Sequence, residues 1–383
     1  MTTISSQKIM EKVVSLNFSE SELRGKTMQS VTARCCPWCG RLWKLNINLE
    51  KGVFRCPACD ESGNAVKLHA KLQDISYEQA KDELFKDNSK PKKIIKLETV
   101  ENIELASLAR RDMVYRSIIK HGICSGDQYN DLIRRGLDDD QVRNYVTVIS
   151  GMNNSAKTWC KELKNVLLEN ETQIKGVPGI YGKASKDEYG NEIKDDLVLN
   201  LPKYAGYLIP VITHRQNKPA ISCFQIRHFS GTPRYSFFTS SGLENGVSVS
   251  GCNKVHYTRN FWDKEGKMII PETVNLTEGA LKADVAAYLS GRQFIAILGV
   301  NDIKDLKHEL MFLKKGGCKN INICFDMDYQ TNPNVAKALR KLQALIAEAG
   351  LNIRNITWDK TYKGIDDYLL AAKKAKQSSQ KCH

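Results

Sequence analysis

Residues 273–298, TVNLTEGALKADVAAYLSGRQFIAIL, determine how the last third of the chain folds. The apolar and β-branched run before Glu278 predicts a strand that ends at this glutamate. The apolar spacing over Leu281–Leu289, followed by Gly291, predicts a helix with a glycine stop. Phe294–Leu298 predicts a second strand. This order indicates a βαβ unit and therefore a mostly parallel sheet.

The same alternation continues towards residue 358. It predicts, in order, a helix over Leu306–Leu313, a strand over Ile321–Cys324, a helix over Val335–Ala349 and a strand over Ile353–Trp358. Open α/β sheets place their sites at the carboxyl ends of the strands. Glu278 and Asp326 are predicted at the carboxyl ends of two of these strands, so we expect both carboxylates at one edge of the sheet.

Acidic side chains gather at this predicted edge. Asp326 and Asp328 are two apart, so on extended backbone they would point to the same side. An isolated Asp-x-Asp is usually a solvated strand end, but here the strand order places it beside Glu278. Three converging carboxylates are costly unless a hard cation neutralises them, and Mg²⁺ prefers a few carboxylates together with phosphate oxygens. The pattern therefore suggests phosphoryl or nucleotidyl transfer.

Three motifs carry a family resemblance: Leu276–Gly279, Asp326–Asp328 and Lys363–Leu369. As a set they resemble the TOPRIM domain shared by bacterial replicative primases, topoisomerases and some nucleases. The resemblance covers residues 270–372 and implies Mg²⁺ or Mn²⁺ held by Glu278, Asp326 and Asp328, aided by Asp366 or Asp367. Replicative primases carry an aspartate four residues after the glutamate, where this chain has Lys282. We expect Lys282 to meet a phosphate instead.

Two cysteine pairs near the N-terminus predict a metal site. Sixteen residues separate Cys36-Pro37-Trp38-Cys39 from Cys56-Pro57-Ala58-Cys59, a spacing typical of structural zinc. A disulfide is the alternative, but disulfides are rare in the cytosol, and no signal peptide or apolar span is evident, so we expect a cytoplasmic zinc protein. Four thiolates close the tetrahedron and leave no catalytic position. The region resembles the zinc-binding domain of bacterial primases, which have a histidine at the position of Cys39.

A basic and aromatic stretch occupies the middle of the chain. No Asp or Glu occurs from Leu197 to Leu243, and aromatic rings alternate with basic residues that suit nucleic-acid or nucleotide phosphates. The alternative is a β-rich domain in which the aromatic side chains pack in the hydrophobic core, and we favour this interpretation for most of the rings. The stretch loosely resembles the primase polymerase core, and this implies that Arg227 and Arg234 lie beside nucleotide or template. The predicted binding residues are Lys203, Arg215, Lys218, Arg227, Arg234 and Lys282.

Composition bounds the organisation. The formal net charge of +14 and the pI near 9.1 suit a polyanionic partner, although basicity alone also fits a membrane surface. Residues 176–190 are expected to form a loop, and no Walker A motif is present. The predicted fold is multidomain α/β: a zinc ribbon (1–85), a basic linker (86–104), a helical then β-rich middle domain (105–269), a TOPRIM domain (270–372) and a polar tail (373–383).

Together these features predict a primase of the kind found in bacteria, phage and mobile elements. It would make short RNA primers on single-stranded DNA from nucleoside triphosphates, with structural Zn²⁺ and catalytic Mg²⁺ or Mn²⁺. A helicase supplied in trans is the expected partner, and no membrane is involved. Two alternatives stay open: a TOPRIM nuclease with the same carboxylates, or a non-catalytic zinc-ribbon DNA-binding protein.

Overall fold

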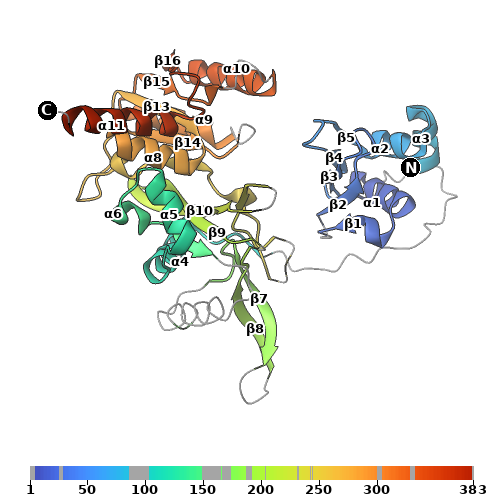
Figure 1. The fold of residues 1–383 in the computed structure, drawn as a ribbon. Helices are drawn as coiled ribbons and strands as arrows, with labels where there is room; N and C mark the ends of the chain where they lie inside the picture. The colour runs from blue at the N-terminus through green and yellow to red at the C-terminus, as the bar shows by residue number, and fades with distance from the viewer. Residues whose placement is uncertain are drawn as a thin grey trace. The chain divides into compact units, whose positions relative to one another are not determined.

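The computed structural model describes residues 5–25, 29–85, 103–148, 165, 174–186, 192–202, 204–230, 233–241, 243, 245–299, 304–327 and 333–381. The chain forms two compact units, Met1–Asn102 and Ile103–His383 (Figure 1). Nearly all of the predicted basic linker lies outside the described residues, as do the predicted site residues Lys203 and Asp328.

The first unit is a small antiparallel sheet with three helices. The sheet order is β1-β2-β3-β4-β5, and its core combines residues from helices and strands, such as Met10, Leu45 and Leu68. His69 is buried and contacts Asn17 and Glu83, and it is not part of the cysteine cluster. The elements are α1 (Ser6–Asn17), η1 (Glu20–Glu22), β1 (Leu23–Arg24), β2 (Ser30–Cys35), β3 (Leu42–Asn48), β4 (Val53–Arg55), β5 (Ser62–Asn64), α2 (Ala65–Gln73) and α3 (Tyr77–Phe85).

The second unit begins with helices and a four-stranded sheet of order β11-β10-β9-β6. The long pair β9 and β10 carries much of this unit's core, in which Tyr207, Phe224 and Phe238 are buried. The core interpretation of the aromatic stretch holds for these three rings and for the partly buried Phe237, whereas Tyr204, Phe229 and Tyr235 are exposed. The elements are α4 (Leu108–His121), α5 (Gly126–Arg134), α6 (Asp139–Val142), β6 (Val146–Val148), β7 (Ile180–Lys186), β8 (Glu192–Leu199), β9 (Gly206–Arg215), β10 (Lys218–His228), β11 (Tyr235–Phe237), η2 (Val249–Gly251), β12 (Val255–Tyr257) and η3 (Arg259–Phe261).

The prediction of a loop over 176–190 was wrong. Residues from Ile180 onward form β7, which pairs with β8 in an antiparallel hairpin that extends away from the β9–β10 sheet (Figure 1). Ile180 and Tyr181 are good strand formers, and they pair with Leu199 and Val198. The nearby glycines suggest a loop, but the partner strand that overrides them comes later in the chain.

The C-terminal sheet is mostly parallel, as predicted. Its order is β12-β14-β13-β15-β16, and only β12 pairs antiparallel. The matching elements are β13 (Thr273–Glu278), α8 (Ala280–Ser290), β14 (Phe294–Ile297), α9 (Lys304–Lys315), β15 (Asn320–Ile323), α10 (Pro333–Glu348), β16 (Asn352–Asn355) and α11 (Ile365–Lys381).

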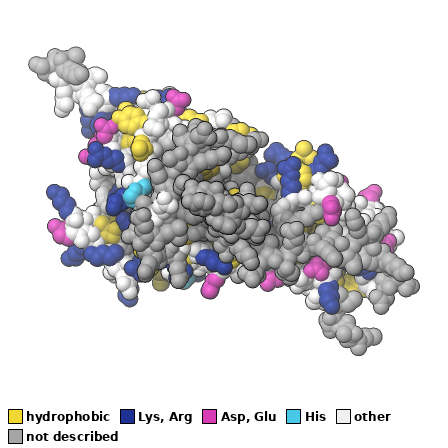
Figure 2. All heavy atoms as spheres, turned by 90° about the horizontal axis from the view of Figure 1, so that it is seen from below, with side chains coloured by type: hydrophobic (Ala, Val, Ile, Leu, Met, Phe, Trp, Pro, Cys, Tyr) yellow, Lys and Arg dark blue, Asp and Glu magenta, His cyan; other side chains and the backbone are white. Residues whose placement is uncertain are grey.

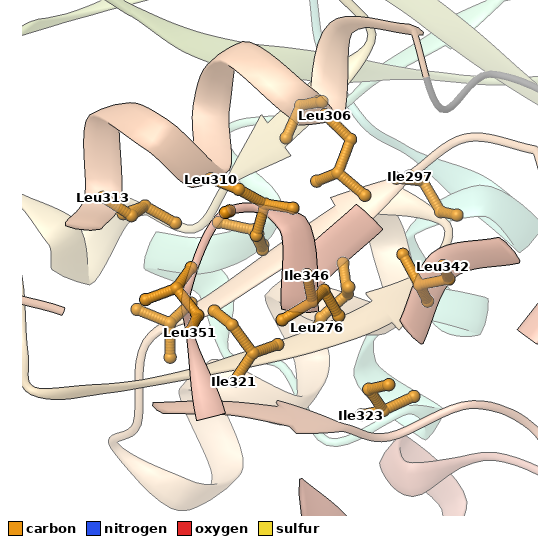
Figure 3. Packing of buried hydrophobic residues seen from close by; sticks show 14 of the residues in the cluster. Leu276, Ile297, Leu306, Leu310, Leu313, Ile321, Ile323, Leu342, Ile346 and Leu351 are labelled. Carbon is orange, nitrogen blue, oxygen red and sulfur yellow. The ribbon is translucent and has the colours of Figure 1, made fainter. Parts of the chain in front are cut away.

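Alternation along the strands divides this sheet into two buried faces. Leu276, Ile297 and Ile321 face α9 and α10, where Figure 3 shows them against the leucines of these helices. Phe294 and Ala296, which alternate with Ile297 on β14, face α8 and α11 on the other side. Helices on both faces of a parallel sheet give a three-layer arrangement, in which the strand ends remain available for a site.

Two expectations about this part differ from the structure. β15 ends at Ile323, so the strand stops three residues before Asp326 instead of reaching it. Asp328 lies outside the described residues, and a shared side for Asp326 and Asp328 stays a prediction. The predicted polar tail from residue 373 instead continues α11 to Lys381. Alanines and lysines in this segment are strong helix formers, which explains why the helix does not stop at the last packed turn.

Helix α8 joins the two sheets of the second unit. Leu281 and Val285 pack with Tyr207 and Ile209 of β9, while Ala283 packs on the parallel sheet. The start of α8 and the end of β13 therefore lie close to β9 and β10. On the face drawn in Figure 2, Lys and Arg side chains are scattered over the described surface instead of forming one patch. No helix of the described segments is both long and apolar enough to cross a membrane.

Candidate functional site

A cleft of about 500 Å³ opens at the strand ends of the parallel sheet. Its acidic side comes from the ends of β13 and β15 and the start of α11, and its basic side comes from α5, β10 and the segment before β11. The charged residues that line it are Arg135, Arg227, Arg234, Glu278, Lys282, Asp326, Lys363, Asp366 and Asp367. The cleft is thus lined by both signs of charge and is large enough for a nucleotide-sized ligand.

Glu278 reaches the cleft because β13 ends there. Gly279 follows with φ of 83°, a left-handed conformation that favours glycine, and α8 begins at the next residue. This sharp turn keeps Glu278 at the mouth of the cleft and places Lys282 one helical turn further on. The local sequence Thr-Glu-Gly therefore places Glu278 at the carboxyl end of the strand, as predicted.

Lys282 and Asp326 form an ion pair inside the cleft. The Lys282 Nζ donates to Asp326 Oδ1, and both side chains are largely shielded from solvent. This contact has a structural consequence, because the ammonium group of Lys282 neutralises the Asp326 carboxylate. The sequence predicts that Lys282 meets a phosphate, whereas this structure holds it on Asp326.

Asp366 is the most buried acid of the cleft, at 6% exposure. Its Oδ2 lies 3.7 Å from Arg135 Nη1, whereas its buried Oδ1 accepts no hydrogen bond within the described part of the chain. Burial raises the pKa of Asp366, and the nearby Asp367 carboxylate adds to the effect while Lys282 opposes it. A Cβ at Gly364 would collide with Asp366 Oδ1, so a larger residue there would displace this carboxylate.

Asp131 holds the basic side of the cleft and is absent from the residues predicted from sequence. Its carboxylate, 3% exposed, accepts from Arg135 Nε at 3.1 Å, Arg227 Nε at 3.2 Å and the Tyr207 hydroxyl at 3.0 Å. Burial alone would raise the pKa of Asp131, but the arginines, Arg135 foremost, lower it to about 2. Arg227 in turn donates to the Tyr235 hydroxyl at 2.9 Å. The guanidinium groups are therefore fixed before any ligand binds.

The predicted basic residues separate into two groups. Arg227, Arg234 and Lys282 line the cleft. Arg215 and Lys218 instead pair with each other at the turn of the β9–β10 hairpin, whereas Arg227 pairs with Tyr207 at its opposite end. Of these two, Lys218 donates to the Glu265 carbonyl at 3.4 Å. The structure thus places three of the predicted binding residues beside the carboxylates of the cleft and leaves Arg215 and Lys218 outside it.

The four predicted cysteines of the first unit converge. Their Sγ atoms all lie within 4.8 Å of one another, with Cys36 and Cys59 at 3.8 Å and Cys39 and Cys56 also at 3.8 Å. These thiols are not joined in disulfides. A set of four thiolate donors fits tetrahedral Zn²⁺ and leaves no open position. Trp38 stacks on Phe54 beside the site, with ring centroids 4.9 Å apart.

The acids of the cleft form a looser donor set. Carboxylate oxygens are the donors that Mg²⁺ takes, and the unpartnered Asp366 Oδ1 fits such a use. Among the described residues, however, the cysteines are the only group of three or more potential metal ligands this close together. The cleft carboxylates thus have the right chemistry for a divalent cation, but Asp326 is already paired with the ammonium group of Lys282.

The Asp131 network gives a first testable prediction. Asp131→Asn should destabilise the second unit by about 3 kcal/mol or more, because it leaves buried guanidinium groups uncompensated. The folded pKa of Asp131, about 2, lies below its ordinary value of 3.8. Its stabilisation is therefore present above pH 3.8 and lost as the pH falls toward 2. Thermal unfolding measured across this range should show the acid-dependent loss in the wild type and lack that part of it in the variant.

Asp140→Asn is the matched control, because Asp140 pairs with Arg143 at 3.4 Å with both side chains about 80% exposed. An exposed pair contributes about 0–1 kcal/mol. Equal unfolding temperatures for the two variants would contradict a supporting role of Asp131.

Comparisons with known proteins give one partial family match and several distant structural likenesses. Residues 261–376, less than half of the chain, match a family described as a domain of unknown function (DUF3854). No curated protein matches the sequence.

Solved structures to which the chain is similar include the zinc-binding and RNA polymerase domains of the Aquifex aeolicus primase, at 16% identity and a TM-score of 0.46, covering 98% of this chain and 85% of that one. A DNA primase domain from Pseudomonas aeruginosa matches at 15% identity and 0.42, covering 68% and 74%. The primase fragment of the bacteriophage T7 primase-helicase matches at 12% and 0.35, covering 91% and 97%. With TM-scores this low, these likenesses do not by themselves assign a function.

Proposed function

We propose that this protein is a primase that makes short RNA primers on single-stranded DNA from nucleoside triphosphates. The observation that carries the proposal is the cleft in which strand-end carboxylates face fixed arginines. Such an arrangement suits a ligand that carries phosphates and a reacting hydroxyl group. The arginines would bind the phosphates, and the carboxylates would lie beside the atoms whose charge changes during the reaction. The resemblance of the glutamate, Asp-x-Asp and Lys363–Leu369 motifs to the TOPRIM domain supports the same function.

The acidic residues have the catalytic role in this proposal. Glu278, Asp326 and Asp328 would hold Mg²⁺ or Mn²⁺, aided by Asp366 or Asp367, and the bound cation would supply charge neutralisation for nucleotidyl transfer. Lys282 would have to share or leave Asp326 when the triphosphate enters, and its ammonium group would then be available to a phosphate oxygen. Arg135 and Arg227, held by Asp131, would orient the triphosphate or template without a change of shape.

The cysteine ribbon would help select the template. A closed Cys₄ site supplies a rigid scaffold rather than chemistry, and the basic composition of the chain suits nucleic acid. A helicase supplied in trans remains the proposed partner.

A non-catalytic DNA-binding function is the second candidate, and the ion pair between Lys282 and Asp326 favours it. If the ammonium group remains on Asp326, the carboxylate is satisfied without a cation. The protein would then retain DNA but extend nothing. Incubation with single-stranded template and labelled ribonucleotides separates the candidates, because a primase extends, a nuclease cleaves and a binding protein only retains.

The exposed Arg234 gives a second testable prediction. Arg234→Ala should weaken binding of single-stranded DNA and reduce the salt dependence of log K by about 0.7 for each phosphate that the protein no longer binds. The fold should not change, because Arg234 is exposed. Arg227→Ala should weaken binding too, although its removal also disturbs Asp131. The measurement is fluorescence anisotropy with a labelled oligonucleotide at several salt concentrations.

Arg340→Ala is the control, because Arg340 is an exposed arginine of α10 and does not line the cleft. If Arg234→Ala and Arg227→Ala bind with the same affinity and salt slope as Arg340→Ala, the basic stretch serves only the fold.

A further inference from the structure

A second basic pocket lies away from the cleft. It has a volume of about 440 Å³ and is formed by the end of α4, the β9–β10 hairpin, η3 and the loop that follows η3. It shares no lining residue with the cleft. Its charged lining residues are Arg116, Lys120, Arg259, Asp263 and Lys264. Four cations and one acid make this a strongly positive hollow, for which the cleft chemistry offers no use.

Within the described part of the protein, only one of these four cations forms an ion pair with an acidic side chain. Arg116 donates from Nε to Asp112 Oδ1 at 2.9 Å and from Nη2 to the Pro219 carbonyl at 2.8 Å. The acid of the pocket, Asp263, accepts the backbone N–H of Lys267 at 2.7 Å. Across the described residues, no acidic side chain lies within ion-pair distance of the remaining cations. These are Lys120, Arg259 and Lys264.

The positive charge of Arg259 lies in a partly desolvated position in this pocket. Its side chain reaches solvent, yet burial of the guanidinium group lowers the pKa of Arg259. Asp284 and Tyr145 raise this pKa, and the positive charge of Arg116 lowers it further. A cation in a concave, partly desolvated position attracts anions more strongly than one on a flat surface. An anionic ligand would therefore relieve the repulsion between Arg116 and Arg259.

The walls of the pocket are apolar and include an aromatic ring. Ile119, Ile212 and Ile221 line it together with Trp262. The indole N–H of Trp262 donates to the Asn217 carbonyl at 2.8 Å, which fixes the ring. A fixed aromatic ring beside several cations is the combination that binds a nucleotide unit, because the ring meets a base and the cations meet its phosphate.

We propose that this pocket is a second site for nucleotide phosphate, separate from the cleft. Lys120 and Lys264 act as flexible point charges, and Arg259 offers a planar guanidinium group to phosphate oxygens. The phosphate belongs either to a nucleic-acid strand that runs past the cleft or to a free nucleotide. Neither source requires that the cleft be catalytic, so the proposal goes beyond the primase function and does not depend on it.

The test uses the full chain and the double variant K120Q/K264Q. Both lysines are exposed, and the variant should melt like the wild type. The matched control is K315Q, since Lys315 is an exposed lysine in the last turn of α9, as Lys120 is in the last turn of α4. Binding is measured without divalent cations, with a labelled dT₁₂ strand in one arm and ATP in the other.

For the strand arm we expect roughly tenfold weaker binding at low salt and a salt slope shallower by about 1.4, the value for two phosphates that are no longer neutralised. Weaker binding of ATP with an unchanged strand arm would identify a free nucleotide as the source. If K120Q/K264Q matches K315Q in both arms, the pocket is not a phosphate site. Failure of primer synthesis would overturn the primase proposal and leave these binding results standing.

Discussion

Replacing Asp326 by asparagine is expected to lower primer synthesis at least ~100-fold, by analogy with the loss of a key electrostatic group at a reacting centre. The substitution is nearly isosteric and removes one negative charge from the acidic side of the cleft. In the proposed function that charge helps to hold the divalent cation, so the decrease should appear in turnover with either Mg²⁺ or Mn²⁺. The measurement is the initial rate of labelled ribonucleotide incorporation on a single-stranded template.

The ion pair with Lys282 changes the expected effect on stability. Repulsion among converging acids would predict a gain of stability when Asp326 loses its charge. Because the ammonium group of Lys282 already contacts Asp326, we expect instead a modest decrease. Glu348→Gln is the control, since it breaks the exposed pair with Lys307, which spans 3.4 Å. Near wild-type synthesis by Asp326→Asn, with both cations, would show that the chemistry lies elsewhere.

Removal of zinc should unfold the ribbon of the first unit. Structural zinc in small domains binds with apparent free energies of about 10–16 kcal/mol, which is folding free energy because the site does not exist in the unfolded chain. Cys36 and Cys56 are buried in the core cluster of this unit, so removal of the metal should also loosen Leu45 and Phe54 around them. Elemental analysis should give one zinc per chain, and hydrogen exchange should show reduced protection in β2 to β4 after chelation.

The neighbouring cysteines offer a matched pair of variants. Cys36→Ser removes a member of the cluster, whereas Cys35→Ser changes an exposed thiol outside it. We expect zinc loss and unfolding of the ribbon in the first and neither in the second. Freshly purified protein without zinc, or equal zinc content in the two variants, would contradict the assignment.

The parallel sheet could be predicted from sequence because its signals are local. Apolar and β-branched residues recur in each strand, and a glycine stands within two residues of the ends of α8, α9 and α10. The hairpin of β7 and β8 could not be predicted in the same way, because its glycines suggest a loop and the pairing depends on a second strand. The C-terminal helix was underestimated for a similar reason: its last turns are polar and hold their shape by propensity rather than packing.

The positions of the cleft residues could be predicted only where a local sequence pattern places them. Glu278 ends β13 and Asp326 comes shortly after β15, so both could be placed at strand ends, and both line the cleft. The support of Arg227 by Asp131 crosses 96 residues of sequence, and no local pattern encodes it. One signal was available: Asp131 precedes Arg134 and Arg135 at helical i+3 and i+4 spacing, which predicts ion pairs on α5. The contact between Lys282 and Asp326 is likewise long-range.

Template-directed synthesis is the core of the proposed function, and a single incubation decides it. The full chain is mixed with single-stranded DNA of mixed sequence, labelled ribonucleoside triphosphates and Mg²⁺ or Mn²⁺, and the products are resolved by length on a denaturing gel. We expect short, alkali-labile products that require the template and the cation and disappear with Asp326→Asn. Shortened template strands, or intact template retained by the protein with no labelled product under either cation, would contradict the proposed function.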